Sequence, residues 1–144
     1  MNYTLDTNIL LHVLKASDKG IKVREKIKND NPNLIISIVT KAEILSITKQ
    51  REWGSKKLSS LNKLLESLLI IPIDTDELVK TYAEIDAFSQ GKLKDKPLHM
   101  TSRNMGKNDL WIAATAHLTN SILLTTDNDF NHLDPSYFTI DNLD

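Results

Sequence analysis

Five short apolar runs separate longer segments of helical period, so strands and helices are expected to alternate along this chain. The runs are residues 2–5, 34–38, 70–73, 122–125 and 137–140. Apolar residues recur at spacings of three and four between them, which predicts the order βααβααβααβαβ. Strands separated by helices pair in parallel through helical crossovers. We therefore expect an α/β fold in which helices cover both faces of a mostly parallel sheet of about five strands.

The organisation of the chain favours a single domain spanning residues 1–144, because no linker, internal repeat or low-complexity tract divides it. Pro72 lies in the third apolar run and predicts an edge position or a strand start there. Residues 90–106 are polar and basic and lack a clear period, which predicts an unusually long loop. Loops of that length are commonly functional.

Composition excludes several classes of site. The chain contains no cysteine, so disulfides, thiol chemistry and cysteine-bound zinc or iron–sulfur centres are ruled out. No apolar run approaches the roughly 18 residues needed to cross a bilayer, and the N-terminus does not resemble a secretory signal. We therefore expect a cytoplasmic protein that does not associate with a membrane.

Four acidic residues, Asp6, Glu43, Asp109 and Asp127, each stand where an apolar run ends or a helix begins. Parallel strands bring their carboxyl ends to one edge of the sheet, where α/β proteins bind their ligands. Carboxylates gathered at that edge repel one another unless a cation lies among them, and hard divalent cations prefer oxygen ligands. The sequence therefore predicts an Mg²⁺ or Mn²⁺ site and a metal-dependent enzyme.

Each acid also has a local structural explanation. Asp6 and Asp127 are suited to capping the helices that follow them. Thr40 and Glu43 have the spacing of a capping box, and Asp109 is expected in a first helical turn, where the helix dipole favours a carboxylate. Capping does not explain why such acids recur after strands whose ends meet at one edge. Capping and metal binding remain compatible, because a carboxylate has two oxygens.

The acids also occur in recognisable local motifs, in a fixed order along nearly the whole chain. These motifs are Asp6-Thr7-Asn8, Ala42-Glu43-Ile44, Asn108-Asp109 before Ile112-Ala113-Ala114, and Thr125-x-Asp127-x-Asp129-Phe130. The ordered set resembles the PIN-domain family and, within it, the VapC-type toxins of bacterial toxin–antitoxin pairs.

This resemblance implies a three-layer α/β/α fold and an Mg²⁺- or Mn²⁺-dependent endoribonuclease. It further implies a homodimer that is inhibited by a small antitoxin protein encoded beside it. Carried over by motif, Asp6, Glu43, Asp109 and Asp127 are the catalytic acids and, with Asp129, the metal ligands. Asn8 and Thr125 resemble the polar residues that orient those carboxylates.

Phosphodiester hydrolysis requires an attacking water, neutralisation of charge in the transition state and stabilisation of the leaving oxygen. The motifs contain no side chain suited to act as a nucleophile, so a water made more acidic by the metal is expected to attack. Glu43 or Asp127 is expected to accept its proton.

All 18 Lys and Arg residues lie between Lys15 and Lys107, so RNA contacts must come from that part of the chain. One basic cluster, residues 15–28, is interleaved with apolar residues and favours a solvated helix face. The second leads directly to Asp109, and we expect it to contact RNA. Its candidate residues are Lys94, Lys96, Arg103 and Lys107.

Two other families with carboxylates at strand ends do not fit this sequence. A phosphoacceptor receiver domain needs an acidic pair after an early strand and a lysine after a late strand, and this chain has neither. A haloacid-dehalogenase phosphatase needs an aspartate at the position of Asn8. A housekeeping RNA-processing nuclease of the same fold would share these motifs. A non-catalytic scaffold that binds RNA or protein is a further alternative, although this chain keeps all four acids.

Overall fold

The computed structural model describes residues 1–144 and has the element order predicted from the sequence, with a short 3₁₀ helix before the last strand. The elements are β1 (Asn2–Leu5), α1 (Thr7–Lys15), α2 (Asp18–Asp30), β2 (Asn33–Ser37), α3 (Ile38–Gln50), α4 (Ser55–Glu66), β3 (Leu69–Ile71), α5 (Asp76–Ser89), α6 (Lys107–Leu118), β4 (Ile122–Thr125), η1 (Asn128–Leu133) and β5 (Thr139–Asn142). None of these helices is both long enough and apolar enough to span a membrane.

The sheet has the strand order β3-β2-β1-β4-β5, and all four pairings are parallel. The chain builds outward from β1 through β2 to β3, and then returns to add β4 and β5 on the other side of β1. The strand order therefore reverses between β1 and β4. In sheets of this kind, ligands bind at the carboxyl ends of the strands beside such a switch point.

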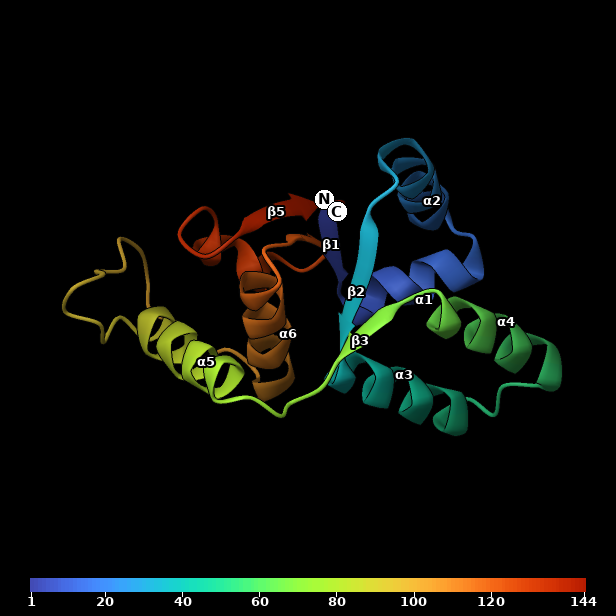
Figure 1. The fold of residues 1–144 in the computed structure, drawn as a ribbon, viewed down its shortest axis with the longest axis horizontal. Helices are drawn as coiled ribbons and strands as arrows, with labels where there is room; N and C mark the ends of the chain where they lie inside the picture. Colours follow the sequence, from blue (N-terminus) through green and yellow to red (C-terminus); the bar gives the residue numbers. More distant parts are fainter.

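Helices cover both faces of the sheet, which confirms the three-layer architecture. Figure 1 shows α1, α2 and α4 on one side of the strands and α5 and α6 on the other. Successive residues of a strand point to opposite faces. Leu124 accordingly packs in the core beneath α1, α2 and α4, whereas Leu123 packs with α5 and α6.

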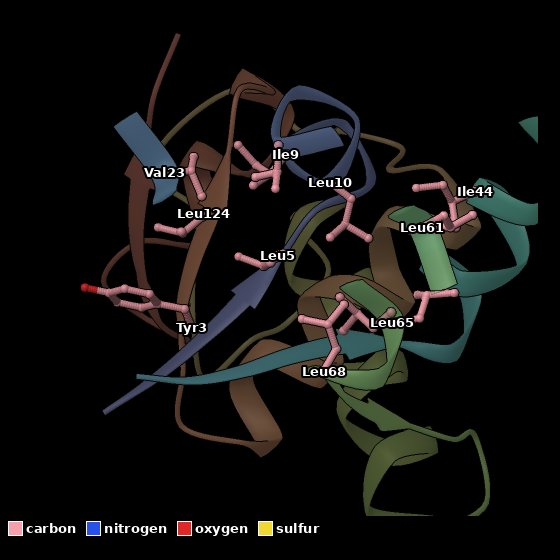
Figure 2. Close-up of a cluster of buried hydrophobic side chains, with 12 residues drawn as sticks. Tyr3, Leu5, Ile9, Leu10, Val23, Ile44, Leu61, Leu65, Leu68 and Leu124 are labelled. Atoms are coloured by element: carbon pink, nitrogen blue, oxygen red, sulfur yellow. The ribbon is translucent and has the colours of Figure 1, made fainter. Parts of the chain in front are cut away.

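The first core is built where apolar residues of α1 and α4 meet the sheet. Leu5 of β1 lies among Ile9 and Leu10 of α1 and Leu61 of α4, and all four are at most 1% exposed (Figure 2). The i, i+3 and i, i+4 spacing of these helices places their apolar residues on one stripe. Burial of that stripe fixes α1 on the sheet, and with it Asp6, the residue that precedes the helix.

Two strand predictions need correction. The run at 137–140 does not pair over its whole length, because β5 begins at Thr139. Tyr137 and Phe138 instead bury their side chains in the second core, and the Tyr137 amide donates to Leu133 O at 2.9 Å. β3 ends at Ile71, so Pro72 follows the strand. The predicted edge position is confirmed, since β3 is an outer strand.

Helix α2 is tied to the C-terminal end of the chain by ion pairs. Lys19 Nζ lies 2.8 Å from an Asp144 carboxylate oxygen, and Lys26 Nζ lies 3.0 Å from one of Asp141. These contacts give part of the first basic cluster a structural role.

The predicted loop 90–106 connects α5 to α6 without a helix or strand of its own. Leu93, Leu98 and Met105 pack against the second core at three points along it. The Arg103 amide donates to Ser89 O at 2.7 Å, which returns the chain to the end of α5 before α6 begins. The loop is thus attached to the fold near its end.

Candidate metal centre

Asp6 lies at the switch point of the sheet, directly after β1. Its Oδ1 accepts a hydrogen bond from the Thr7 amide at 2.7 Å, and its Oδ2 accepts one from Thr125 Oγ1 at 2.9 Å. Asp6 is the N-cap of α1, as predicted, and is 5% exposed. Both of its oxygens are therefore held in fixed positions.

The Thr125 hydroxyl joins the ends of the two strands on either side of the switch point. While it donates to Asp6, its oxygen accepts a hydrogen bond from the Asp127 amide at 2.9 Å. The backbone adds a second connection, since the Asp6 amide donates to Leu124 O at 3.1 Å. One hydroxyl thus sets the positions of two acidic residues that are 121 positions apart in the sequence.

Glu43 approaches the same edge from α3. Its Oε1 accepts a hydrogen bond from Thr7 Oγ1 at 2.9 Å. The expected capping box of Thr40 and Glu43 is wrong, because α3 begins earlier, at Ile38, with Ser37 as its N-cap. Thr40 lies inside the helix, and its buried hydroxyl has no hydrogen-bond partner. Glu43 is consequently free of a capping role.

Thr7 is a site residue that the sequence reasoning missed. It holds Glu43 through its side chain and Asp6 through its amide. The only feature of the sequence that could have identified Thr7 as a site residue was its place inside the Asp6-Thr7-Asn8 motif. Asn8 was expected to orient a carboxylate, but its side chain is exposed and makes no hydrogen bond.

Asp109, Asp127 and Asp129 form the closest group of acids. Each has a carboxylate oxygen within 4.8 Å of an oxygen of the other two. Asp109 lies in the first turn of α6, whose N-cap, Gly106, contributes no side-chain bond. Asp127 caps η1, where its Oδ1 accepts a hydrogen bond from the Asp129 amide at 2.8 Å.

The carboxylates at this edge perturb one another. Burial, together with the smaller effects of the charges of Asp6, Asp127, Glu43 and Asp129, raises the pKa of Asp109 to about 6. Burial also raises the pKa of Asp6. Hydrogen bonds from the threonine hydroxyl and the neighbouring amide oppose that rise, while two nearby carboxylates add to it. The folded chain therefore holds unneutralised negative charge here.

The donor set suits a hard divalent cation. It consists of carboxylate oxygens from separate elements, which Mg²⁺ and Mn²⁺ prefer. Histidine nitrogens do not contribute. His12 bonds Ser17 and His117 bonds Tyr137 O, each through Nδ1, while the His132 Nε2 bonds Ser89.

The four cations expected to contact RNA differ in their surroundings. Arg103 lies beside the acids, and its guanidinium donates to Asn128 O at 3.4 Å. Lys107 is exposed at the start of α6, two residues before Asp109. Lys96 instead covers the Tyr137 ring, 3.8 Å from its centroid. Lys94 is exposed and makes no ion pair or hydrogen bond.

Comparisons with known proteins agree with this geometry. The family model described as the PIN domain matches residues 3–135. Ribonuclease VapC1 of Haemophilus influenzae strain R2866 is 31% identical over 126 residues, which is 87% of this chain and 86% of that protein. Ribonuclease VapC2 of strain Rd is 24% identical over 87% of this chain and 86% of its own length.

Solved structures share the fold. A crystal structure of VapBC2 from Rickettsia felis, bound to a DNA fragment from its promoter, contains a chain with a TM-score of 0.74 and 24% identity. The match covers all of both chains. VapBC-1 from nontypeable Haemophilus influenzae gives a TM-score of 0.75 at 23% identity, over 99% of this chain and 98% of that chain.

Proposed function

This chain belongs to the PIN-domain family, and we propose that it is a metal-dependent endoribonuclease, the toxin of a toxin–antitoxin pair. The observation that carries the proposal is the gathering of Asp6, Glu43, Asp109, Asp127 and Asp129 at the switch point of the sheet. Burial and, to a smaller extent, the charges of the other acids raise the pKa of Asp109 to about 6, a shift typical of carboxylates in functional sites. The curated relatives at 31% identity are named ribonucleases.

The metal is Mg²⁺ or Mn²⁺, and the five acids form its ligand set. When bound, the cation neutralises charge on the phosphate and makes a water more acidic. Thr125 and Thr7 keep Asp6 and Glu43 oriented toward the edge of the sheet by donating to one oxygen of each. Outer partners of this kind commonly change metal affinity or activity by about 10- to 100-fold when removed.

Glu43 or Asp127 accepts the proton of the attacking water. Both are half-buried, and each carboxylate has one oxygen engaged by a hydrogen-bond donor, Thr7 Oγ1 for Glu43 and the Asp129 amide for Asp127. The second oxygen of each is left for the proton or the cation. Arg103 and Lys107, together with Lys94 and Lys96, supply positive charge for the RNA backbone.

The partner is a small antitoxin encoded beside this chain, and the active unit is a homodimer of the single domain 1–144. Structural neighbours at TM-scores of 0.62 and 0.61 are described as a toxin–antitoxin complex from Klebsiella pneumoniae and a member of the VapBC family of toxin–antitoxin systems from Mycobacterium tuberculosis. A neighbouring reading frame for a small protein distinguishes this role from that of a housekeeping nuclease of the same fold.

Removal and return of the metal tests the proposal. Cleavage of a mixed pool of cellular RNA should disappear in EDTA and return with excess Mg²⁺ or Mn²⁺. Asp95→Asn, which alters an exposed acid in the long loop, is the matched control and should behave as wild type. Cleavage that continues undiminished in EDTA would contradict the metal-dependent mechanism.

A further inference from the structure

Two small hollows flank Arg103 beside the acidic edge. One, of about 280 Å³, is lined by Arg103, Asn104, Met105 and Asp129. The other, of about 240 Å³, shares Arg103 and Asn104 and also includes Lys92 and Ser102 in its lining. The two hollows share Arg103 and Asn104, and Asp129 lines the first of them. We call this pair of hollows the Arg103 furrow.

Arg103 is held at the centre of the furrow from both ends. Its amide donates to Ser89 O at 2.7 Å, and its guanidinium donates to Asn128 O at 3.4 Å. The guanidinium makes no ion pair with any carboxylate, even though Asp129 lines the same hollow. A planar guanidinium carries five donors and a permanent charge, which suits it to a phosphate group.

A buried hydrogen bond joins this part of the loop to the segment that carries the acids. Ser89, at the end of α5, is fully buried, and its Oγ lies 2.7 Å from Nε2 of His132. His132 is 3% exposed and belongs to η1, three residues after Asp129. Ser89 therefore contacts η1 through its side chain and Arg103 through its carbonyl.

We propose that the Arg103 furrow binds the RNA phosphate adjacent to the one that is cleaved, with Arg103 as the binding residue and Ser89 and His132 as positioning residues. The inference rests on the proposed nuclease function and specifies one backbone contact of its RNA substrate. The acids would hold the reacting phosphate through the metal, and Asp129, one of these acids, lines the same hollow as Arg103. Lys96 is not part of this subsite, since it covers the Tyr137 ring.

Steady-state kinetics on a short single-stranded RNA test the binding residue. Arg103→Ala should raise KM about tenfold and change kcat much less, because a charge-assisted hydrogen bond to bound RNA is lost. Lys63→Ala, which removes an exposed cation of α4 that makes no ion pair or hydrogen bond, is the control and should match wild type. Equal KM values for wild type and Arg103→Ala would overturn the proposal.

RNA binding in EDTA gives a readout that does not depend on cleavage. The salt dependence of binding should fall by about 0.7 in logarithmic slope for Arg103→Ala, the amount expected for one lost phosphate contact on a single strand. If Arg103 only offsets the charge of the acids, its removal will change the Mg²⁺ concentration needed for half activity and leave RNA affinity unchanged. That result would also overturn the proposal.

Ser89→Ala tests the positioning role, with Ser121→Ala as its matched control. Both variants remove a buried serine hydroxyl, but Ser121 lies before β4 at the opposite end of the sheet. Both should lower the melting temperature, whereas only Ser89→Ala should weaken RNA binding in EDTA, by about threefold or more. Equal RNA affinity in the two variants would show that Ser89 and His132 do not position Arg103 for RNA binding.

These results separate the subsite from the proposed function. If wild type cleaves RNA and Arg103→Ala is unchanged, the subsite is wrong and the nuclease function stands. If wild type cleaves no RNA but its binding in EDTA depends on Arg103, the furrow is an RNA site and the nuclease function is wrong.

Discussion

The two ends of the same sheet are built from different polar chemistry. At the carboxyl ends of β1 and β4, Asp6, Asp109 and Asp127 lie together and burial raises the pKa of the first two. At the amino ends, Asn2 Nδ2 donates to Thr119 O at 2.8 Å and Asn33 Nδ2 donates to Asn2 Oδ1 at 2.9 Å. Neutral amides and carbonyl oxygens are thus paired at the amino end, whereas the carboxylates at the other end repel one another.

Cavity size does not identify the acidic end of the sheet as the binding site, because the larger hollow lies at the amino end. A hollow of about 610 Å³ lies at the amino end, and its lining includes Asn2, Asn33 and Thr119 but no titratable side chain. The hollow beside Asp129 is less than half that volume. Unneutralised charge therefore marks the proposed metal centre better than cavity volume does, because it implies a cation that the chain itself does not provide.

The largest predicted effect is the loss of RNA cleavage when a carboxylate at the acidic end of the sheet is removed. We expect Asp6→Asn and Asp109→Asn each to reduce RNA cleavage by roughly a thousandfold or more, since several kcal/mol of transition-state stabilisation depend on a held metal. The melting temperature should stay equal or rise, because like charges are removed from the metal-free protein. Cleavage assays and thermal melts on the same preparations check both effects.

An amino-end variant supplies the control for that experiment. Asn2→Ala should lower stability by about 1 kcal/mol through its lost hydrogen bonds and leave cleavage unchanged. Near-normal activity in both aspartate variants would contradict the assignment of the acidic edge as the catalytic site.

The Thr125 hydroxyl is the next most sensitive point, because it positions two acids at once. Thr125→Val keeps the shape of the side chain but removes the donor to Asp6 and the acceptor for the Asp127 amide. Cleavage should fall by about 10- to 100-fold, as for other partners that orient metal ligands. Thr119→Val at the amino end is the matched change, and cleavage rates for the two variants should differ by that factor.

The smallest expected effect is the pH dependence of stability in the metal-free protein. The pKa of Asp109 is about 6 in the folded chain against an ordinary value of 3.8, so the folded state favours its protonated form. The resulting stability is present below about pH 4 and is lost as the pH rises through 6. Because Asp109 is partly exposed, we expect a loss of about 1 kcal/mol, or about 3 °C in melting temperature.

Thermal melts between pH 4 and 7.5 in EDTA check this dependence. The slope should flatten in Asp109→Asn and stay unchanged in Asn2→Ala, since the Asn2 side chain does not titrate. Equal slopes for wild type and Asp109→Asn would show that folding does not raise the pKa of Asp109.

The sequence predicted most of the fold because it rests on local pattern. β1 and β4 occupy the predicted residues, and the parallel topology follows from the alternation of strands and helices. The gathering of the acids follows in turn, since parallel strands share one carboxyl edge. The start of α3 was misjudged because Ser37, a residue at the end of a strand, also serves as the N-cap.

Contacts between distant segments could not be predicted in the same way. The side-chain hydrogen bond between Thr7 and Glu43 joins residues 36 positions apart, and that between Ser89 and His132 joins residues 43 positions apart. No periodic pattern in the sequence predicts either contact. Nothing in the sequence distinguished the four loop cations from one another as RNA contacts. In the structure their contacts differ, since Lys96 lies over the Tyr137 ring while Arg103 donates a hydrogen bond to η1.

Direct measurement of Mn²⁺ binding by titration calorimetry is the decisive test of the account. Wild type should bind Mn²⁺ and, at pH 6, release protons as the cation displaces the proton of Asp109. Asp109→Asn should bind far more weakly, while Asn33→Ala, altered only at the amino end, should bind as wild type does. Equal Mn²⁺ affinity in wild type and Asp109→Asn, or no binding to wild type, would contradict the claim that the acidic edge is a metal centre.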